Sequence, residues 1–192
     1  MTITIYVSRD SAALALGADR VATAITAEAA KRGQAVRVVR NGTRGMLWLE
    51  PLVEVAIDKG RVGYGPVMPE DVPGLFEAGF LAGGKHVLAL GPTEQIDYFK
   101  RQERLTFARI GMTDPLSVED YQAHEGFSGL KAALAMQPAE IVEAVFQSGL
   151  RGRGGAAFPT GIKWRTVAGV EARQKYIVCN ADEAIPAPSP TA

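Results

Sequence analysis

The sequence has 192 residues but only one cysteine, Cys179, and two histidines. A single thiol cannot form a disulfide within the chain, nor can it hold an iron–sulfur cluster that needs several cysteine ligands. Net charge is also lacking, because 21 basic residues balance 21 acidic ones. Without a basic surface, we expect binding neither to nucleic acid nor to an anionic membrane.

Long hydrophobic runs are absent as well. None approaches the roughly 20 apolar residues that a membrane-spanning helix needs. Residues 1–7 read M-T-I-T-I-Y-V, which lacks the basic segment and long apolar core of a secretory signal and fits a first β-strand. We therefore expect a cytoplasmic protein, and its 47% hydrophobic content suffices for one medium domain or two small ones.

The first 85 residues predict a small α/β layer. Six segments have the hydrophobic spacing of a strand or a helix: a strand over 2–7, a helix over 18–32, strands over 35–39, 52–57 and 61–64, and a helix over 69–80. Gly33 is a suitable end for the first helix, and Asp58-Lys-Gly60 predicts a tight turn between two strands. This order is compatible with a thioredoxin-like α/β fold.

Residues 86–147 predict a linker that leads through helices to a second domain. The helices are expected near 95–100, 117–121, 130–136 and, as a longer amphipathic helix, 138–148. Gly149 is expected to stop the last of them. Further on, residues 175–179 read K-Y-I-V-C, which is typical of a buried strand.

The most informative stretch, residues 148–164, reads S-G-L-R-G-R-G-G-A-A-F-P-T-G-I-K-W. Its glycines let the backbone approach a ligand closely, and successive amide groups can form a nest for an anion. Three cationic side chains lie in the same stretch: Arg151, Arg153 and Lys163. This chemistry suits a cofactor that carries phosphate, whereas the alternative is a solvated surface loop.

Two familiar phosphate-binding motifs do not fit this stretch. Residues 152–157 match G-x-G-x-x-A, but a dinucleotide fingerprint follows a strand, and the preceding residues predict a helix. A P-loop needs glycine, lysine and a hydroxyl residue in succession, and Gly161-Ile-Lys163-Trp164 has an inserted residue and no hydroxyl. Nucleotide hydrolysis is therefore not expected.

A group of polar residues follows the expected strand. Asn180, Asp182 and Glu183 would lie at the carboxyl end of strand 175–179, where α/β sheets commonly bind ligands. Their amide and carboxylates are suited to hydrogen bonds with a flavin or with the nicotinamide side of a dinucleotide. The alternative is an ordinary polar turn after a strand.

Together, the motifs R-G-R-G-G-A-A-F-P-T-G-x-K-W and K-Y-I-V-C-N-A-D-E closely resemble the flavin- and NADH-binding subunit shared by respiratory complex I, NAD-linked hydrogenases and NAD-dependent formate dehydrogenases. The resemblance covers residues 104–183 and includes Arg109–Tyr121, which reads R-I-G-M-T-D-P-L-S-V-E-D-Y. It implies an α/β domain that binds FMN and NAD(H) and passes electrons from the flavin to iron–sulfur clusters.

The resemblance also implies roles for individual residues. The glycine loop and Lys163 would bind FMN and the nearby NAD, Phe158 would help to position the dinucleotide, and the N-A-D-E turn would line the flavin site. The implied cofactor-binding residues are Gly152, Arg153, Gly154, Gly155, Phe158, Lys163, Asn180, Asp182 and Glu183. No residue is expected to bind a metal or to serve as a catalytic acid, base or nucleophile.

The first domain resembles the thioredoxin-like ferredoxin domain that precedes the flavin domain in some of these subunits. There a C-x-G-x-C motif holds part of a cluster, whereas here Thr43 and Leu47 occupy its cysteine positions, and Ser8 and Ala13 lie near the earlier pair. We therefore expect a domain without cluster ligands.

A cysteine-less version of this domain looks most like the beta subunit of molybdenum-containing, NAD-dependent formate dehydrogenase. That likeness implies two kinds of partner, a small iron–sulfur subunit and a molybdenum-containing catalytic subunit. The second choice is the diaphorase subunit of an NAD-linked hydrogenase or of a complex I-type dehydrogenase.

The sequence leaves the family pattern after Glu183. The family continues G-D-S-G-T-F-A-D-R-M, and a coding sequence for that segment with one G deleted reads A-I-P-A-P-S-P-T-A and then a stop, which matches residues 184–192. We therefore expect that residues 184–192 are a frameshifted tail, caused by a single-base deletion or by a sequencing error, and that the domain that carries the family's [4Fe–4S] cluster is lost. Such a fragment is expected to be inactive alone.

Two rival hypotheses remain open. In the first, the chain is a non-catalytic module whose thioredoxin-like domain docks a partner subunit, which predicts complex formation without flavin. In the second, it is a truncated product with no stable fold beyond residue 90.

Overall fold

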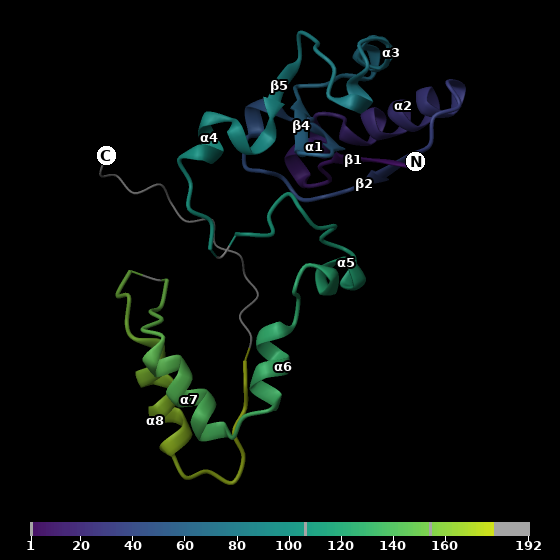
Figure 1. Cartoon of the computed structure of the whole chain (residues 1–192). Coiled ribbons are helices and arrows are strands. Elements are labelled where there is room, and N and C mark those ends of the chain that lie inside the picture. Colours follow the sequence, from purple (N-terminus) through teal and green to yellow (C-terminus); the bar gives the residue numbers. More distant parts are fainter. Residues whose placement is uncertain (1, 106, 154, 179–192) are drawn as a thin grey trace. The chain divides into compact units, whose positions relative to one another are not determined.

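The computed structural model of the chain describes residues 2–105, 107–153 and 155–178. The chain forms two compact units, Met1–Phe127 and Ser128–Ala192, and each is described by itself (Figure 1). Among the residues described, none of the helices is both long and apolar enough to span a bilayer.

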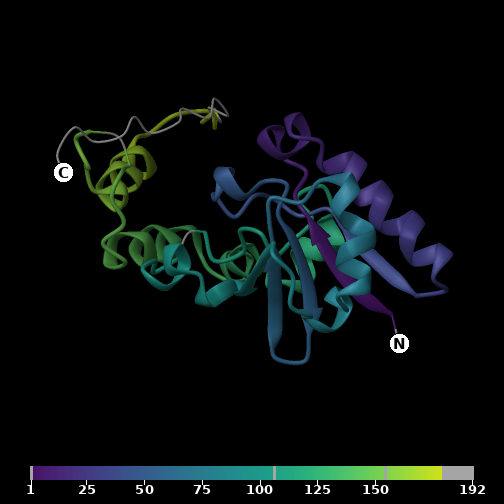
Figure 2. The same ribbon diagram turned by 90° about the horizontal axis from the view of Figure 1, so that it is seen from above.

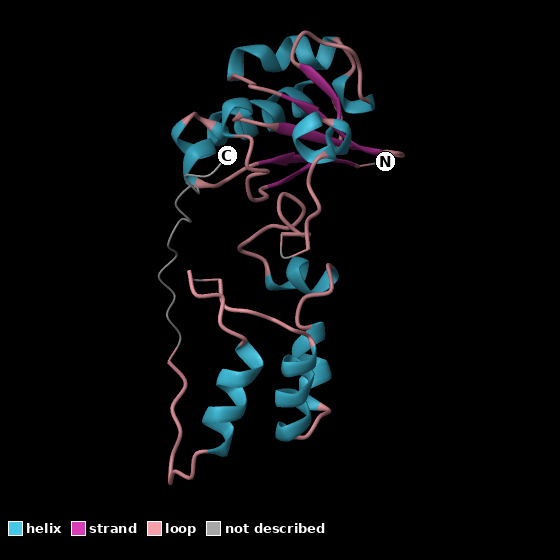
Figure 3. Ribbon diagram, turned by 90° about the vertical axis from the view of Figure 1, so that its left-hand side faces the viewer, coloured by secondary structure: helices cyan, strands magenta, loops and turns pink. Residues whose placement is uncertain are grey.

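The first unit is built on a mixed five-stranded sheet, drawn in magenta in Figure 3. The strands are β1 (Ile3–Val7), β2 (Val36–Val39), β3 (Val53–Ile57), β4 (Gly60–Tyr64) and β5 (Ala89–Pro92). Their order in the sheet is β2-β1-β3-β4-β5. The pair β1 and β2 is parallel, and the other three pairs are antiparallel.

Helical segments surround this sheet. The α-helices of the first unit are α1 (Ser11–Ala15), α2 (Ala18–Lys31), α3 (Val72–Glu77), α4 (Asp97–Lys100) and α5 (Val118–Ala123). Four 3-10 turns accompany them: η1 (Leu47–Leu49), η2 (Pro69–Asp71), η3 (Phe80–Ala82) and η4 (Thr93–Gln95). Helix α2 joins the parallel strands β1 and β2, as a crossover connection requires.

The apolar core lies between one face of the sheet and helices α2 and α3, which Figure 2 shows on the same side of the sheet. Helix α2 contributes Val21, Ile25 and Ala29, which recur every four residues and so share one face. From the strands, Ile5 and Val55 have no exposed surface. Burial of each such strand side chain stabilises the fold by roughly 1.5–3 kcal/mol.

The thioredoxin-like α/β fold predicted for the N-terminal part is confirmed by this sheet and its helices. All four strands expected before residue 85 are present, and α2 ends one residue before its expected end. Helix α1 was not expected; Asp10 caps its N-terminus, because its Oδ1 accepts hydrogen bonds from the amides of Ala12 and Ala13. The sheet also continues to β5, beyond residue 85. The boundary expected at this residue between the thioredoxin-like domain and the linker stays a prediction.

Polar side chains occupy two of the four positions where the resemblance would expect cysteines. Ser8 Oγ donates to Asp10 Oδ2 at 3.0 Å, and Thr43 Oγ1 donates to Glu50 Oε1 at 3.0 Å. The other two positions hold the buried Ala13 and the half-exposed Leu47. The region around these positions is therefore held by hydroxyl–carboxylate hydrogen bonds.

The second unit is helical in the part of the chain that is described. It contains α6 (Ser128–Leu134), α7 (Pro138–Gln147) and α8 (Thr160–Gly169). Helix α7 is the expected amphipathic helix, with Pro138 at its first position and Glu140 Oε2 accepting a hydrogen bond from the amide of Gln137. Helix α8 was not expected.

The buried strand predicted over 175–179 is not seen where the structure describes it. Residues 175–178 have no strand assignment, and Tyr176, Ile177 and Val178 are 78%, 100% and 89% exposed. A strand needs partners for its backbone groups, and the described residues of this unit offer no second strand to pair with it. Cys179 lies outside the described residues.

Candidate functional site

The candidate site is the glycine-rich loop between helices α7 and α8. Helix α7 ends at Gln147, and two residues later Gly149 has a φ of +66°, a conformation that glycine adopts without strain. The chain then turns back on itself and enters α8 at Thr160. A helix therefore precedes this loop, which agrees with the exclusion of a dinucleotide fingerprint, since that motif needs a preceding strand.

Backbone hydrogen bonds close the base of the loop. Arg151 and Pro159 form an isolated antiparallel bridge. The amide of Gly152 donates to the carbonyl of Phe158 at 2.9 Å, and the amide of Thr160 donates to that of Leu150 at 2.8 Å. The turn over residues 152–158 is thus held at its two ends, while its tip is exposed.

Lys163 reaches back to this closed loop from the first turns of α8. Its Nζ lies 5.8 Å from the centroid of the Phe158 ring. A Cβ placed on Gly152 would lie 3.7 Å from the same Nζ. Three of the predicted cofactor-binding residues, Gly152, Phe158 and Lys163, therefore come together.

The glycines of the loop differ in what the fold requires of them. Gly149 has a positive φ, whereas Gly152 and Gly155 do not. A Cβ on Gly152 would make only ordinary contacts of 3.6 Å or more, and one on Gly155 would meet nothing within 4 Å. Neither backbone conformation nor internal packing therefore demands glycine at these two positions.

Helix α8 is held against α7 by an unusually close backbone contact. A Cβ on Gly161 would lie 2.3 Å from Phe146 Cα, so only glycine allows the two helices to approach this far. One turn later, Arg165 pairs with Glu143 of α7 and stacks 3.5 Å from the centroid of the Phe146 ring. These contacts fix the start of α8, and with it the position of Lys163.

The charge distribution favours an anion at this loop. Hydrogen bonds from Gln147 and Arg165 hold the pKa of Glu143 below its ordinary value, so Glu143 is ionised and compensates the charge of Arg165. Arg151, Arg153 and Lys163 have no ion pair with any residue that the structure describes. Cations without an ion pair among the described residues, carried on or beside an exposed glycine loop, are suited to a phosphate.

The remaining predicted site residues fall into two groups. Arg153 and Gly155 lie in the exposed part of the loop. Outside the described residues are Gly154, Asn180, Asp182 and Glu183. Gly161, by contrast, belongs to the motif, but no role was predicted for it from the sequence. Pro159, two residues earlier, is a helix-start signal that indicates α8.

The glycine loop is closed at its base, carries cationic side chains and lies between two packed helices. The model of the Nuo51 FMN-binding domain family matches residues 145–188, which include this loop. Residues 145–188 are thus similar to the Nuo51 FMN-binding domain family.

Several relatives have similar sequences. The chain is 55% identical over 87 residues to the NADP-reducing hydrogenase subunit HndC of Solidesulfovibrio fructosivorans, and the match covers 45% of this chain and 18% of the relative. It is 49% identical over 70 residues to an NADH-quinone oxidoreductase subunit of Streptomyces coelicolor (36% and 16% covered). It is 49% identical over 57 residues to the NAD-reducing hydrogenase HoxS subunit alpha of Cupriavidus necator (30% and 10% covered). The chain thus spans less than a fifth of the length of these relatives.

A solved structure is similar to half of the chain. The thioredoxin-like [2Fe-2S] ferredoxin from Aquifex aeolicus aligns with 50% of this chain and 96% of its own, with a TM-score of 0.41 and 22% sequence identity.

Proposed function

We propose that the glycine-rich loop binds the phosphate of FMN and that the chain is part of a subunit that transfers electrons between NAD(H), FMN and iron–sulfur clusters. The observation that supports this most is the pair of glycines, Gly152 and Gly155, which neither packing nor backbone conformation requires. The match to an FMN-binding domain family supports the identity of the ligand.

The residues present fit the phosphate group. Amides of the loop would donate hydrogen bonds to its oxygens, Arg153 and Lys163 would balance its charge, and the missing Cβ atoms leave room for close approach. When bound, FMN supplies the ability to accept a hydride as an electron pair and to release electrons singly. The chain's own part is to bind and orient the cofactor.

Other predicted residues extend this proposal. Phe158, 47% exposed beside Lys163, offers an aromatic surface for the dinucleotide. Asn180, Asp182 and Glu183 are proposed to line the flavin site on the strength of the family motif that they complete. NAD would bind next to the flavin.

Two arms of one titration test the phosphate assignment. FMN and riboflavin share the isoalloxazine ring and differ in the phosphate, so only FMN can use the loop. We expect the chain to bind FMN weakly, with a Kd on the order of 1 mM, because the loop alone supplies about 4 kcal/mol. Riboflavin should bind at least about tenfold more weakly. Equal affinities of the two ligands would contradict the proposal.

The kind of complex is a finer proposal. We favour an NAD-dependent formate dehydrogenase, with a small iron–sulfur subunit and a molybdenum-containing subunit as partners and a [4Fe–4S] cluster elsewhere in the family's subunit. The support is the thioredoxin-like domain with Ser8, Ala13, Thr43 and Leu47 where cysteines would be expected. The alternative, an NAD-linked hydrogenase, is supported by the 49% identity to the NAD-reducing hydrogenase HoxS subunit alpha.

The metal content of the native complex distinguishes these alternatives. A tagged copy of the subunit, purified from its own host, should bring down a molybdenum protein with formate-dependent NAD⁺ reduction. A nickel-containing partner with hydrogen-dependent activity would identify the hydrogenase instead. A stable complex without flavin would support the non-catalytic docking hypothesis.

A further inference from the structure

The face of the sheet opposite the apolar core is polar. Tyr6 of β1 pairs with Glu54 of β3, and Glu54 pairs with Gly63 of β4, so these residues share the face away from the core. Glu54 is 1% exposed. A carboxylate that is so deeply buried needs a cation and hydrogen-bond donors.

Arg44 supplies both. It binds Glu54 through two hydrogen bonds, from Nε to Oε1 at 2.9 Å and from Nη2 to Oε2 at 2.8 Å, and its own exposure is 5%. Its remaining nitrogen, Nη1, donates to Glu94 Oε1 at 2.9 Å. Arg61 lies 3.6 Å from the same carboxylate of Glu54. The result is a preorganised polar surface with donors left over on Arg61.

One segment of the chain occupies this surface. The carbonyl of Gly111 accepts hydrogen bonds from Asn41 Nδ2 and from Arg61 Nη1, both at 2.7 Å. Arg61 Nη2 also donates to the carbonyl of Met112 at 3.4 Å. Asn41 is 3% exposed, so its amide is directed at Gly111 and not at solvent.

Glycine is the only residue type that fits at position 111. The φ of Gly111 is +69°, and a Cβ at this position would lie 2.1 Å from Arg44 Cδ and 2.3 Å from Arg44 Nε. The contact is therefore backbone against side chain, with no room for even a methyl group. The buried Arg44 cannot move aside without breaking its pair with Glu54.

The docked segment has a folded shape of its own. Arg109 donates to the carbonyl of His124 at 2.6 Å and stacks 5.2 Å from the centroid of the Tyr121 ring. The amide of Asp114 donates to Asp120 Oδ2 at 2.6 Å. These contacts connect residues 109–114 to helix α5, so the segment meets the sheet as a structured element.

We propose that the polar face of the sheet is a docking surface for residues 109–115, and that the thioredoxin-like domain of this chain serves to anchor this segment. The segment reads R-I-G-M-T-D-P and is part of the stretch by which the chain resembles flavin-binding subunits. The domain has no cysteine at the expected cluster positions, and its proposed role is to hold this segment in place. The inference concerns the first unit alone and does not depend on FMN binding.

Limited trypsin digestion of the full chain tests this role at the bond after Arg109. In the unmodified chain, that bond should be cut at least about tenfold more slowly than the bond after the exposed Lys175. Gly111→Ala should raise the rate after Arg109 by about tenfold, because the new methyl group separates the segment from Arg44.

Gly79→Ala is the matched control. Gly79 has nearly the same φ, +71°, but a Cβ there would meet nothing within 4 Å, so it adds the same backbone strain without a collision. In the Gly79→Ala variant, the rate of cleavage after Arg109 should stay within about twofold of the rate in the unmodified chain. Equal rates for Gly111→Ala and Gly79→Ala would overturn the proposal.

A second variant covers the case in which Gly111→Ala does not fold. Asn41→Ala removes one donor to Gly111 and adds no volume, and Asn41 Oδ1 has no partner among the residues described. Amide hydrogen exchange over residues 110–113 should become about fivefold faster in this variant. Unchanged exchange there would equally refute the anchoring role.

Discussion

Lys163 Nζ lies 5.8 Å from the centroid of the Phe158 ring, so the cation of helix α8 stands over an aromatic residue of the glycine loop. The close contact of Gly161 with Phe146 fixes the helix that carries this lysine. Phe158, before Pro159, and Lys163, after it, are thereby held close together. This proximity is the geometric basis of the proposed phosphate site.

Removal of the Lys163 charge should weaken FMN binding. Lys163→Met keeps most of the side-chain length and removes one cation near the loop, so we expect about a tenfold rise in the Kd for FMN and little change for riboflavin. Lys175→Met changes the net charge equally, but its Nζ binds the carbonyl of Ala168 at the other end of α8. If both variants weakened FMN binding equally, the effect would be general attraction and not a site.

The packing of α8 on α7 should depend on Gly161. Gly161→Ala places a methyl group 2.3 Å from Phe146 Cα, and such overpacking costs about 1–3 kcal/mol. Amide exchange in both helices should therefore be faster. Gly169→Ala, in the same helix, meets nothing within 4 Å and should leave exchange unchanged or slower. Unaltered exchange in Gly161→Ala would show that the helices do not pack this closely.

Glu50 should make the first unit sensitive to pH. Burial raises the pKa of its carboxyl above the ordinary 4.5, and the nearby Asp10 acts in the same direction, while hydrogen bonds from Leu52 and Thr43 offset part of the rise. The folded chain therefore favours the neutral carboxyl more than the unfolded chain does. This contribution to stability is complete below the unfolded pKa and is lost as pH rises through the folded pKa.

Glu50→Gln isolates that contribution, because the amide stays neutral at every pH. The free energy of unfolding of the unmodified chain should fall relative to that of Glu50→Gln as pH rises from about 4 to about 8. Denaturant titrations that follow the fluorescence of Trp48, in η1 beside Glu50, provide the measurement. A constant difference between Glu50→Gln and the unmodified chain would exclude Glu50 as the titrating group.

Replacing one member of the buried pair of Arg44 and Glu54 should destabilise the fold far more than replacing both. Arg44→Met leaves Glu54, 1% exposed, without its main partner, and the loss should be about 3–5 kcal/mol of stability. Replacing both residues, as Arg44→Met with Glu54→Leu, should restore most of that loss because no charge stays buried. A double variant as unstable as Arg44→Met alone would show that Arg44 acts mainly through packing.

The sequence predicted those parts of the fold that rest on local spacing. Val21, Ile25 and Ala29 indicate α2 because every fourth residue faces the core. Helix α8 was not predicted, since its first residues belong to a glycine-rich motif and its stability comes from the contact of Gly161 with α7. The predicted strand at 175–178 is wrong in the described part because apolar composition alone does not provide a neighbouring strand.

The cofactor-binding role of the predicted site residues stays a prediction, and the geometry of the loop was not predicted. The motif indicated Gly152, Phe158 and Lys163, and the structure brings them together. The pair of Arg44 and Glu54 was not predicted, because Arg44 lies in a turn-rich stretch where an arginine is usually solvated. Only the register of β1, β3 and β4 shows that Glu54 is buried and needs a cation.

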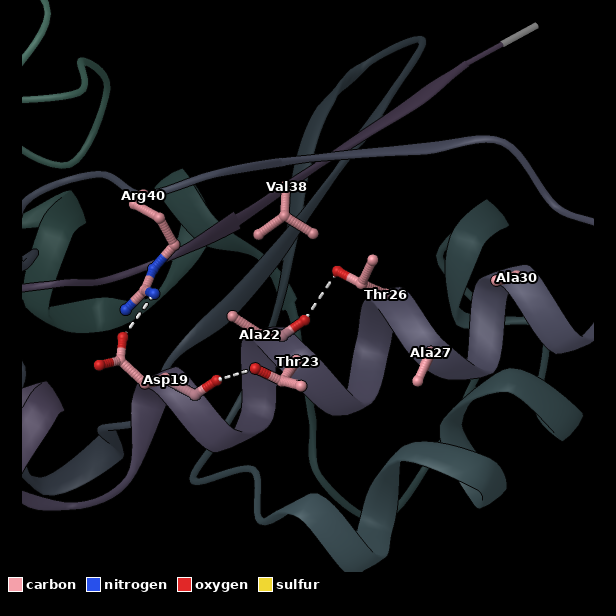
Figure 4. Close-up of a pocket in the computed structure, with 8 residues that line it drawn as sticks. All are labelled: Asp19, Ala22, Thr23, Thr26, Ala27, Ala30, Val38 and Arg40. Carbon is pink, nitrogen blue, oxygen red and sulfur yellow. Dashed lines mark hydrogen bonds and ion pairs between the residues drawn. The ribbon is translucent and has the colours of Figure 1, made fainter.

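The most direct test of the central claim is an amide and lysine-side-chain NMR titration of the isotope-labelled full chain with FMN. We predict chemical-shift changes at the amides of residues 151–155 and at Lys163 Nζ, with a shift of the FMN phosphorus resonance at the same concentrations. Riboflavin should leave these signals unchanged. Gly152→Val should abolish the changes by filling the space beside Lys163. FMN-dependent shifts located elsewhere, for example in the groove between α2 and β2 lined by Thr23, Thr26 and Val38 (Figure 4), would contradict the assignment of the glycine loop.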